Sequence, residues 1–229
     1  MIHNSDYVIT DCEMMKNKIL RNFSFPNEKI ITINLGVDTN VYHPMEYNEE
    51  DFILFPNALR YPSRKGVFFI LPVLNRLLKK HKNMKCILTG NLSSEGKKIL
   101  KNLPNSFKYI GFIQKKELAK LYNQAMYVIF PSLHEGYGLV PKETMACGGV
   151  VISTDVGAVI DYLKTGVNGF ILELNEELWF QKMDDLIKNS SLRESIRKNN
   201  RSEKINSWKE CAQVHFEFFK KILEEKNKI

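Results

Sequence analysis

The chain has 229 residues, of which 44% are hydrophobic and 26% charged, and its formal net charge at pH 7 is +7. This composition excludes an intrinsically disordered chain, and every apolar run is well below the ~20 residues that a membrane-spanning helix needs. The positive charge alone does not distinguish nucleic acid, anionic membrane and phosphorylated ligands as partners, but no RNA-binding pattern of interleaved basic and aromatic residues accompanies it.

Short runs of β-branched and aromatic residues recur along the chain, and most are separated by segments with helical periodicity. The expected strands are Tyr7–Thr10, Ile30–Asn34, Phe52–Pro56, Lys85–Gly90, Phe107–Gly111, Tyr127–Pro131, Val150–Ser153 and Gly169–Leu172. The expected helices are 13–23, 67–82, 115–125, a helix ending at 143–148, and, in the purely helical stretch after Glu176, 176–189 and 208–226. This alternation predicts an α/β fold, a doubly wound parallel sheet with C-terminal helices.

The four cysteines, Cys12, Cys86, Cys147 and Cys211, are too far apart in sequence for a zinc knuckle or a redox pair. We therefore expect reduced, mostly buried thiols and no metal site. The N-terminus lacks a signal-peptide pattern, which predicts a cytoplasmic protein.

The segment Pro131–Gly149, PSLHEGYGLVPKETMACGG, begins where an expected strand ends. Open α/β sheets bind ligands at the carboxyl ends of their strands. Gly136 and Gly138 permit positive φ and a close approach of the backbone to a ligand, and Pro141 suits a first helical turn. The N–H groups and dipole of the following helix would favour a phosphate.

Two glutamates accompany this phosphate-binding pattern. Glu135 precedes the glycine turn and Glu143 lies about one turn inside the helix, so they could hold hydroxyl groups on either side of a central diphosphate, as in a nucleotide sugar. Alternatives remain open, because Glu143 could serve the helix dipole alone and Glu135 could be an ordinary surface residue. His134 could be a base, but a single loop histidine is more often an ordinary polar residue.

The stretch 134–153, HEGYGLVPKETMACGGVVIS, resembles the signature of the large family of retaining glycosyltransferases of the GT-B fold, which contains sucrose synthases and bacterial mannosyl- and glucosyltransferases. Glu135 and Glu143 have the family's spacing of eight positions, and Tyr137 takes its aromatic place. Further segments resemble the family in the same order, namely 33–44, 57–66, 110–132 and 153–172. The resemblance implies a Rossmann-like, C-terminal half of a GT-B enzyme.

The resemblance also implies residue roles. Arg60 and Lys65 would hold the donor diphosphate, and Glu135 the hydroxyls of the transferred sugar, as the catalytic set. Glu143 would bind the ribose. The other donor-binding residues would be Gly136, Tyr137, Gly138, Leu139 and Val140 in the signature loop, and Phe112 and Ile113 beside the base.

Physical chemistry supports the basic pair independently, because the leaving diphosphate gains charge as the glycosidic bond breaks and fixed cations stabilise that charge. The alternative is a solvated loop that happens to hold two of the chain's 33 basic residues. The donor would be a UDP- or GDP-linked sugar, without a metal or other cofactor, and transfer would retain the anomeric configuration.

Five positions depart from the family pattern. Asn57 stands where a glycine is usual, Val140 replaces a common proline, Lys142 a common apolar residue, Ala158 a glycine and Asp161 a glutamate. The departures at Asn57 and Ala158 bear on the geometry of the phosphate-binding loops.

The resemblance covers nearly all of this chain but only part of a GT-B enzyme. We expect a remnant βα unit of the acceptor-side domain at 1–30, a donor-binding domain at 31–205, and a helix at 206–229 that packs toward the acceptor-side domain. About 150 residues or more of a typical enzyme would precede it.

The expected partner is a nucleotide sugar, with either a separate acceptor-domain chain or self-association through residues 6–23. We expect no nucleic acid as a partner, and the family and the +7 charge together predict a peripheral contact with the inner face of the membrane. The alternative function is a nucleotide-sugar-binding module without transferase activity of its own.

Overall fold

The structure is a computed structural model that describes residues 4–226. Its main body is built on a six-stranded, fully parallel sheet with the strand order β5-β4-β3-β6-β7-β8. The strands are β3 Glu50–Phe55, β4 Lys85–Leu88, β5 Phe107–Tyr109, β6 Ala125–Phe130, β7 Val151–Ser153 and β8 Phe170–Ile171. All six coincide with expected strands, which confirms the predicted α/β class.

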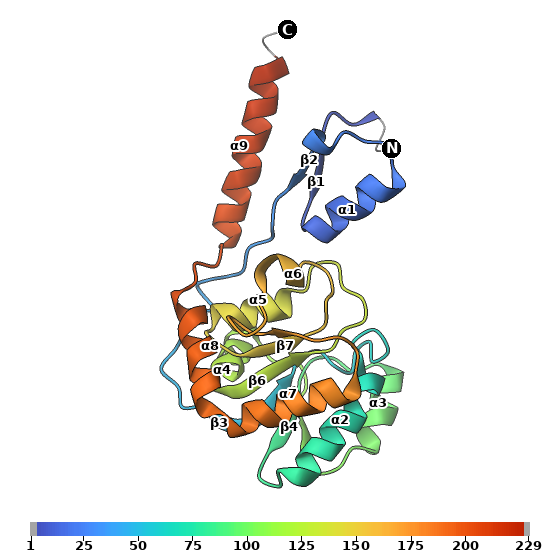
Figure 1. Ribbon diagram of the computed structural model, residues 1–229, viewed down its shortest axis with the longest axis vertical. Coiled ribbons are helices and arrows are strands. Elements are labelled where there is room, and N and C mark those ends of the chain that lie inside the picture. Colours follow the sequence, from blue (N-terminus) through green and yellow to red (C-terminus); the bar gives the residue numbers. More distant parts are fainter. Residues whose placement is uncertain (1–3, 227–229) are drawn as a thin grey trace.

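Helices cover both faces of this sheet (Figure 1). They are α2 Val67–Lys80, α3 Ser94–Lys101, α4 Lys115–Gln124, α5 Leu139–Ala146, the short α6 Val159–Tyr162, α7 Glu176–Lys188 and α8 Ser190–Ser202. Side chains alternate across each strand, so Ile53 packs with the α2 and α7 residues Leu74 and Trp179 on one face, whereas Leu54 packs with Tyr122 of α4 on the other. The sheet is therefore doubly wound.

The N-terminal unit consists of β1 Val8–Thr10, α1 Glu13–Asn22, the 3-10 turn η2 Asn27–Lys29 and β2 Ile30–Thr32. β2 pairs in parallel with β1 and not with the large sheet. This unit thus extends two residues past the boundary expected at residue 30. The long helix α9, Trp208–Lys226, projects from the body beside it (Figure 1), and the Phe218 ring meets the Tyr7 ring edge-on at 5.4 Å.

Two chain segments connect the N-terminal unit and α9 to the body, and they lie side by side in a parallel bridge between Val37 and Ser207. Val37 donates its N–H to the Asn206 carbonyl at 3.0 Å, and Trp208 donates to the Val37 carbonyl at 3.1 Å. A Cβ atom at Gly36 would lie 2.3 Å from the Ser207 carbonyl carbon. The close contact between the two segments therefore requires glycine at position 36.

The N-terminal unit contacts the body through a small apolar cluster. Cys12 packs with Tyr137 and Ala158, and the Asp161 carboxylate accepts a hydrogen bond from the backbone N–H of Glu13 at 3.0 Å, at the start of α1. No residue of α1 is fully buried, and Phe23 is 43% exposed. Docking of residues 6–23 against a further domain or a second copy stays a prediction.

All four cysteines are free and buried, as predicted. Within residues 4–226, no helix combines the length and the apolar character that crossing a membrane requires.

Candidate functional site

The loops that follow β3 and β6 meet at the carboxyl edge of the large sheet, because these strands are neighbours in it. The N–H of Leu133 donates to the Arg64 carbonyl at 2.8 Å. Gly66 adopts a φ of +69°, and a Cβ there would lie 1.9 Å from the Pro131 carbonyl oxygen. The two loops are thus held in direct backbone contact, and they carry the expected catalytic residues.

Lys65 and Glu135 form an ion pair across these loops, with 2.7 Å between Nζ and Oε1. Both side chains are largely buried, 11% and 12% exposed, and the Lys65 ammonium also lies 5.0 Å from the centre of the Phe130 ring. A buried lysine beside the positive end of a helix would be costly without a counter-charge, so the pair stabilises the unliganded site. The sequence predicted both residues but not this contact.

Arg60 lies on the same loop but is exposed, and its guanidinium group stacks on the Tyr61 ring at 5.2 Å from the centroid. Arg64 stacks on the same ring at 4.9 Å. Within the described part of the chain, Arg60 forms no ion pair. Its positive charge therefore lies at the surface without a carboxylate partner among the described residues.

The signature loop presents its backbone and turns its aromatic side chain away. Gly136 is exposed with open space where a Cβ would be, whereas the Tyr137 side chain is buried and its hydroxyl donates to the Leu35 carbonyl at 3.2 Å. Gly138 has a φ of +90° and accepts a hydrogen bond from the Tyr162 hydroxyl at 2.6 Å. Tyr137 could therefore serve a donor only through its backbone.

α5 starts directly after this loop, and Leu139, Val140 and Pro141 form its first turn. Their amide positions make the helix N-terminus the polar edge of the site, and proline at this turn sacrifices no intrahelical hydrogen bond. Lys142, unusual for the family, is buried with its ammonium donating to the Tyr137 hydroxyl at 2.8 Å and to the Leu35 carbonyl. Lys142 thus fastens α5 to the segment that leads from the N-terminal unit.

Glu143 lies beyond the first turn of α5, so the helix dipole does not explain it. Its carboxyl group accepts a hydrogen bond from the Tyr122 hydroxyl at 3.2 Å, and Tyr42 is a second hydrogen-bonding partner. Burial raises the pKa of this carboxyl to about 7, although the two tyrosines and the charge of Lys115 act in the opposite direction. Sequence reasoning missed Tyr42 and Tyr122, since nothing in their local pattern distinguishes them from core tyrosines.

A pocket of about 690 Å³ lies between the loop after β3 and the start of α4, and it includes Lys115, whose charge acts on the Glu143 carboxyl group. Phe112, 65% exposed, and Ile113 line it together with Lys115 of α4, and their contact with a base stays a prediction. Asn57 also lines it, and with a φ of 54° it keeps the left-handed conformation that the usual glycine would take. Asparagine is among the few residues other than glycine that adopt this conformation at low cost, so the departure at position 57 is compatible with a left-handed turn.

The remaining singled-out residues lie elsewhere. Ala158 is buried under the N-terminal unit and donates its N–H to the Tyr137 carbonyl at 2.8 Å, and Asp161 binds α1. His134 is exposed, and no contact supports a role as a base. Residues 4–226 contain no group of three or more His, Cys, Asp or Glu side chains placed to hold a metal ion.

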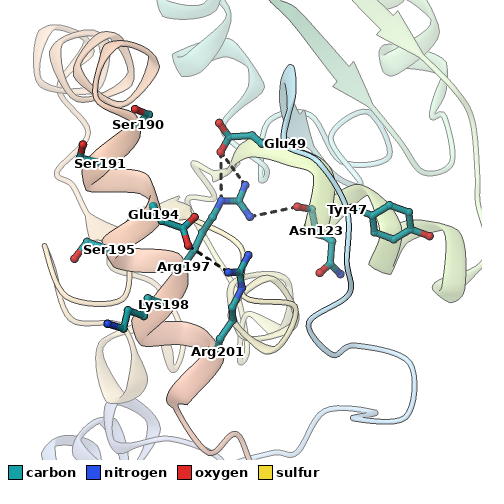
Figure 2. Close-up of a pocket in the computed structure, with 10 residues that line it drawn as sticks. All are labelled: Tyr47, Glu49, Asn123, Ser190, Ser191, Glu194, Ser195, Arg197, Lys198 and Arg201. Carbon is teal, nitrogen blue, oxygen red and sulfur yellow. Dashed lines mark hydrogen bonds and ion pairs between the residues drawn. The ribbon is translucent and has the colours of Figure 1, made fainter.

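A second polar pocket, about 670 Å³, lies at the opposite edge of the sheet (Figure 2). Glu49 immediately precedes β3, and Asn123 lies in the last turn of α4 just before β6, so the pocket is at the amino ends of the strands. The buried Arg197 donates to the Glu49 carboxylate at 3.1 Å and to the Asn123 carbonyl at 3.2 Å (Figure 2). The hydrogen-bonding capacity of these groups is used within the protein. We therefore interpret this pocket as a structural junction, and the pocket lined by Phe112 and Ile113 as the better candidate for a ligand.

The raised pKa of Glu143 predicts a pH-dependent stability. The folded pKa of about 7 exceeds the ordinary value of 4.5, so ionisation opposes folding as the pH rises from about 4.5 to 7. Above pH 7 this cost amounts to about 3 kcal/mol. We expect Glu143→Gln to raise the thermal midpoint at pH 8 and to leave it nearly unchanged at pH 4.5, measured by calorimetry. The exposed Glu46→Gln is the control, and an equal gain at both pH values would contradict the assignment.

Comparison with known proteins identifies the fold and the family. The family model described as Glycosyl transferases group 1 matches residues 43–203. An uncharacterized glycosyltransferase of Methanocaldococcus jannaschii is 26% identical over 97% of this chain and 62% of its own length. Among solved structures, the sucrose-phosphate synthase of Thermosynechococcus elongatus superposes with a TM-score of 0.85, at 19% identity, over 98% of this chain and 60% of that one. Anabaena HepE in complex with UDP and glucose superposes with a TM-score of 0.80, at 18% identity, over 96% of this chain and 64% of that one.

The chain thus spans about three-fifths of the length of these relatives. The match of the family model extends over all six strands of the large sheet, the ion-paired loops and α5. The chain therefore belongs to the group 1 glycosyl transferases.

Proposed function

We propose that this chain is the donor-binding part of a retaining glycosyltransferase that moves a sugar from a nucleoside diphosphate to a hydroxyl acceptor. The observation that carries this proposal is the convergence of Lys65, Glu135 and the N-terminus of α5 at one edge of the sheet. Cations, backbone N–H groups and a carboxylate in this arrangement fit a ligand with a diphosphate centre and hydroxyl-bearing ends.

In the proposed complex, Lys65 and Arg60 neutralise the diphosphate while Glu135 holds a hydroxyl of the transferred sugar. Glu143 takes the ribose, and the base enters the pocket lined by Phe112 and Ile113. Because Lys65 already contacts Glu135, its ammonium can bridge the sugar-binding carboxylate and a phosphate oxygen. This places the cation where negative charge develops during bond cleavage.

The proposed transfer breaks the bond between the anomeric carbon and the phosphate oxygen and forms a bond from that carbon to the acceptor oxygen on the same face. The acceptor proton passes to the leaving phosphate. No metal is required, because Lys65, Arg60 and the helix N-terminus supply the positive charge. Uridine is the first base to test, since the solved relative from Anabaena contains UDP and glucose.

The relatives are longer than this chain, so the acceptor side is proposed to come from a further domain that docks on the N-terminal unit and α9. We also propose that residues 6–23 contact either a separate acceptor-domain chain or a second copy of this chain. The proposed location is the cytoplasm, with peripheral contact to the membrane. The second candidate function is a module that binds nucleotide sugars without transferring them.

Titration calorimetry with UDP-glucose, GDP-mannose and ADP-glucose tests the donor-binding proposal. We expect one of the three to bind, and Glu143→Ala to weaken its binding at least tenfold through loss of hydrogen bonds to a charged group. Binding of none of these donors would contradict both candidate functions. Release of free nucleotide by this chain alone, when an acceptor is added, would exclude the pure binding module.

A further inference from the structure

The Glu143 carboxyl group is surrounded by two phenols that come from distant parts of the chain. Tyr42 belongs to the segment before β3 and Tyr122 to α4, and their ring centres lie 5.9 Å apart. Tyr42 is 4% exposed and Tyr122 is 0% exposed. The Glu143 side chain itself is of intermediate exposure, so two buried phenols lie against a partly accessible carboxyl group. We call these three side chains the Tyr–Glu cluster.

The hydrogen-bonding capacity of this cluster leaves room for a ligand. An ionised carboxylate only accepts hydrogen bonds and offers about four lone-pair positions. Tyr122 donates to Oε2 at 3.2 Å, and Tyr42 is the other side-chain partner. About two acceptor positions thus remain, the number that a vicinal diol uses.

The other charged or titratable groups around the cluster are few. Lys115, on the rim of the neighbouring pocket, lowers the pKa of Glu143, and Asp38 faces Tyr42. The Cys147 thiol is kept neutral because burial raises its pKa. Burial beside Glu143 also raises the pKa of both phenols, so both remain hydrogen-bond donors at any pH that the protein experiences.

We propose that Tyr42 and Tyr122 are positioning residues, whose hydroxyls fix and partly stabilise the ionised Glu143 carboxylate so that its free lone pairs receive the ribose diol of the donor. This inference rests on the proposed function, because it assigns the same ribose-binding carboxylate. It adds two residues outside the signature, and it explains how a largely buried glutamate can be ionised near neutral pH.

The proposal gives donor binding a definite pH dependence. Ribose hydroxyls donate to the ionised form, so donor binding weakens as the pH falls below the pKa of free Glu143, which is about 7. The loss approaches tenfold per pH unit. Removing a phenol that stabilises the ionised form raises that pKa, and the inflection of the binding curve moves to higher pH.

The test is titration calorimetry with UDP-glucose, or with whichever of the three donors the wild type binds, between pH 5.5 and 8.5. The diphosphate of such a donor does not titrate in this range, so the protein determines the profile. We expect Tyr122→Phe to move the inflection up by about one pH unit and to weaken binding at pH 7 about five- to tenfold, as loss of a charge-assisted hydrogen bond implies. Tyr42→Phe should act in the same direction and less strongly, and Glu143→Gln should flatten the profile.

Tyr127→Phe is the matched control. Tyr127 is as buried as Tyr122, but its hydroxyl donates to the Met183 carbonyl at 3.3 Å on the other face of the sheet. This variant should lose a comparable amount of stability and keep the wild-type profile, which separates positioning from a general effect of deleting a buried hydroxyl.

The outcomes separate the two proposals. Binding by the wild type with an unmoved inflection in Tyr42→Phe and Tyr122→Phe would overturn the positioning role and leave the donor site intact. If Tyr122→Phe does not fold, Tyr42→Phe alone decides by the same criterion. Absence of binding by the wild type at every pH would overturn the donor site itself, and the positioning role with it.

Discussion

Lys65→Ala is expected to weaken binding of UDP-glucose, or of the donor that the wild type prefers, by about 100-fold at pH 7.5. Two effects combine, since the variant loses charge-assisted hydrogen bonds to the diphosphate and leaves the Glu135 carboxylate unpaired beside it. The remaining carboxylate would then repel the phosphates. Titration calorimetry measures the change directly.

Arg64→Ala supplies the control, because it removes a positive charge from the same loop at a side chain to which the proposal assigns no contact with the donor. The double variant Lys65→Met/Glu135→Gln should bind better than Lys65→Met alone, since it removes the unpaired carboxylate together with the ammonium. Wild-type affinity in Lys65→Ala would contradict the assigned role of Lys65.

Glu49→Gln is expected to lower the free energy of unfolding by about 3 kcal/mol, at the lower limit for breaking a buried ion pair. Arg193 and Arg197 are 6% and 4% exposed, and both donate hydrogen bonds to the Glu49 carboxylate. The variant leaves two buried guanidinium groups without their counter-charge. We place the effect at the lower limit because the Glu49 side chain itself is 28% exposed.

Urea unfolding monitored by circular dichroism measures this change, with Glu50→Gln as the control. Glu50 is the next residue, but its carboxylate receives only an exposed hydrogen bond from Gln124. A loss below about 0.5 kcal/mol, the range of ordinary surface substitutions, would show that the junction in Figure 2 contributes little to stability.

The sheet could be predicted from the sequence because each strand is a short run of β-branched and aromatic residues between turn signals. Helix α8 was not among the clear helical segments, since its buried face consists largely of Arg193, Arg197 and Asn200 and so lacks an apolar stripe. Helix α3 is short and contains Gly96, which weakens its helical signal. Both omissions reflect polar or permissive residues that tertiary contacts hold in place.

The candidate site could be predicted only where its residues share a local motif. The signature indicated Glu135 and Glu143 by their spacing, and the basic loop indicated Lys65. The contacts between these loops depend on β3 lying beside β6 in the sheet, which no local pattern encodes. Tyr42 and Tyr122 were missed for the same reason, because both are distant from Glu143 in the sequence and only the fold brings them near it.

The backbone bridge between Val37 and Ser207 has a mechanical consequence. Two segments of the chain leave the body, one that joins it to the N-terminal unit and one that joins it to α9. Backbone hydrogen bonds tie the two segments together at Val37 and Ser207. Any movement that separates the two segments would have to break these bonds, so the connections to the N-terminal unit and to α9 are held as one tied pair. A side chain at position 36 would clash with Ser207, so the tie also depends on glycine at this position.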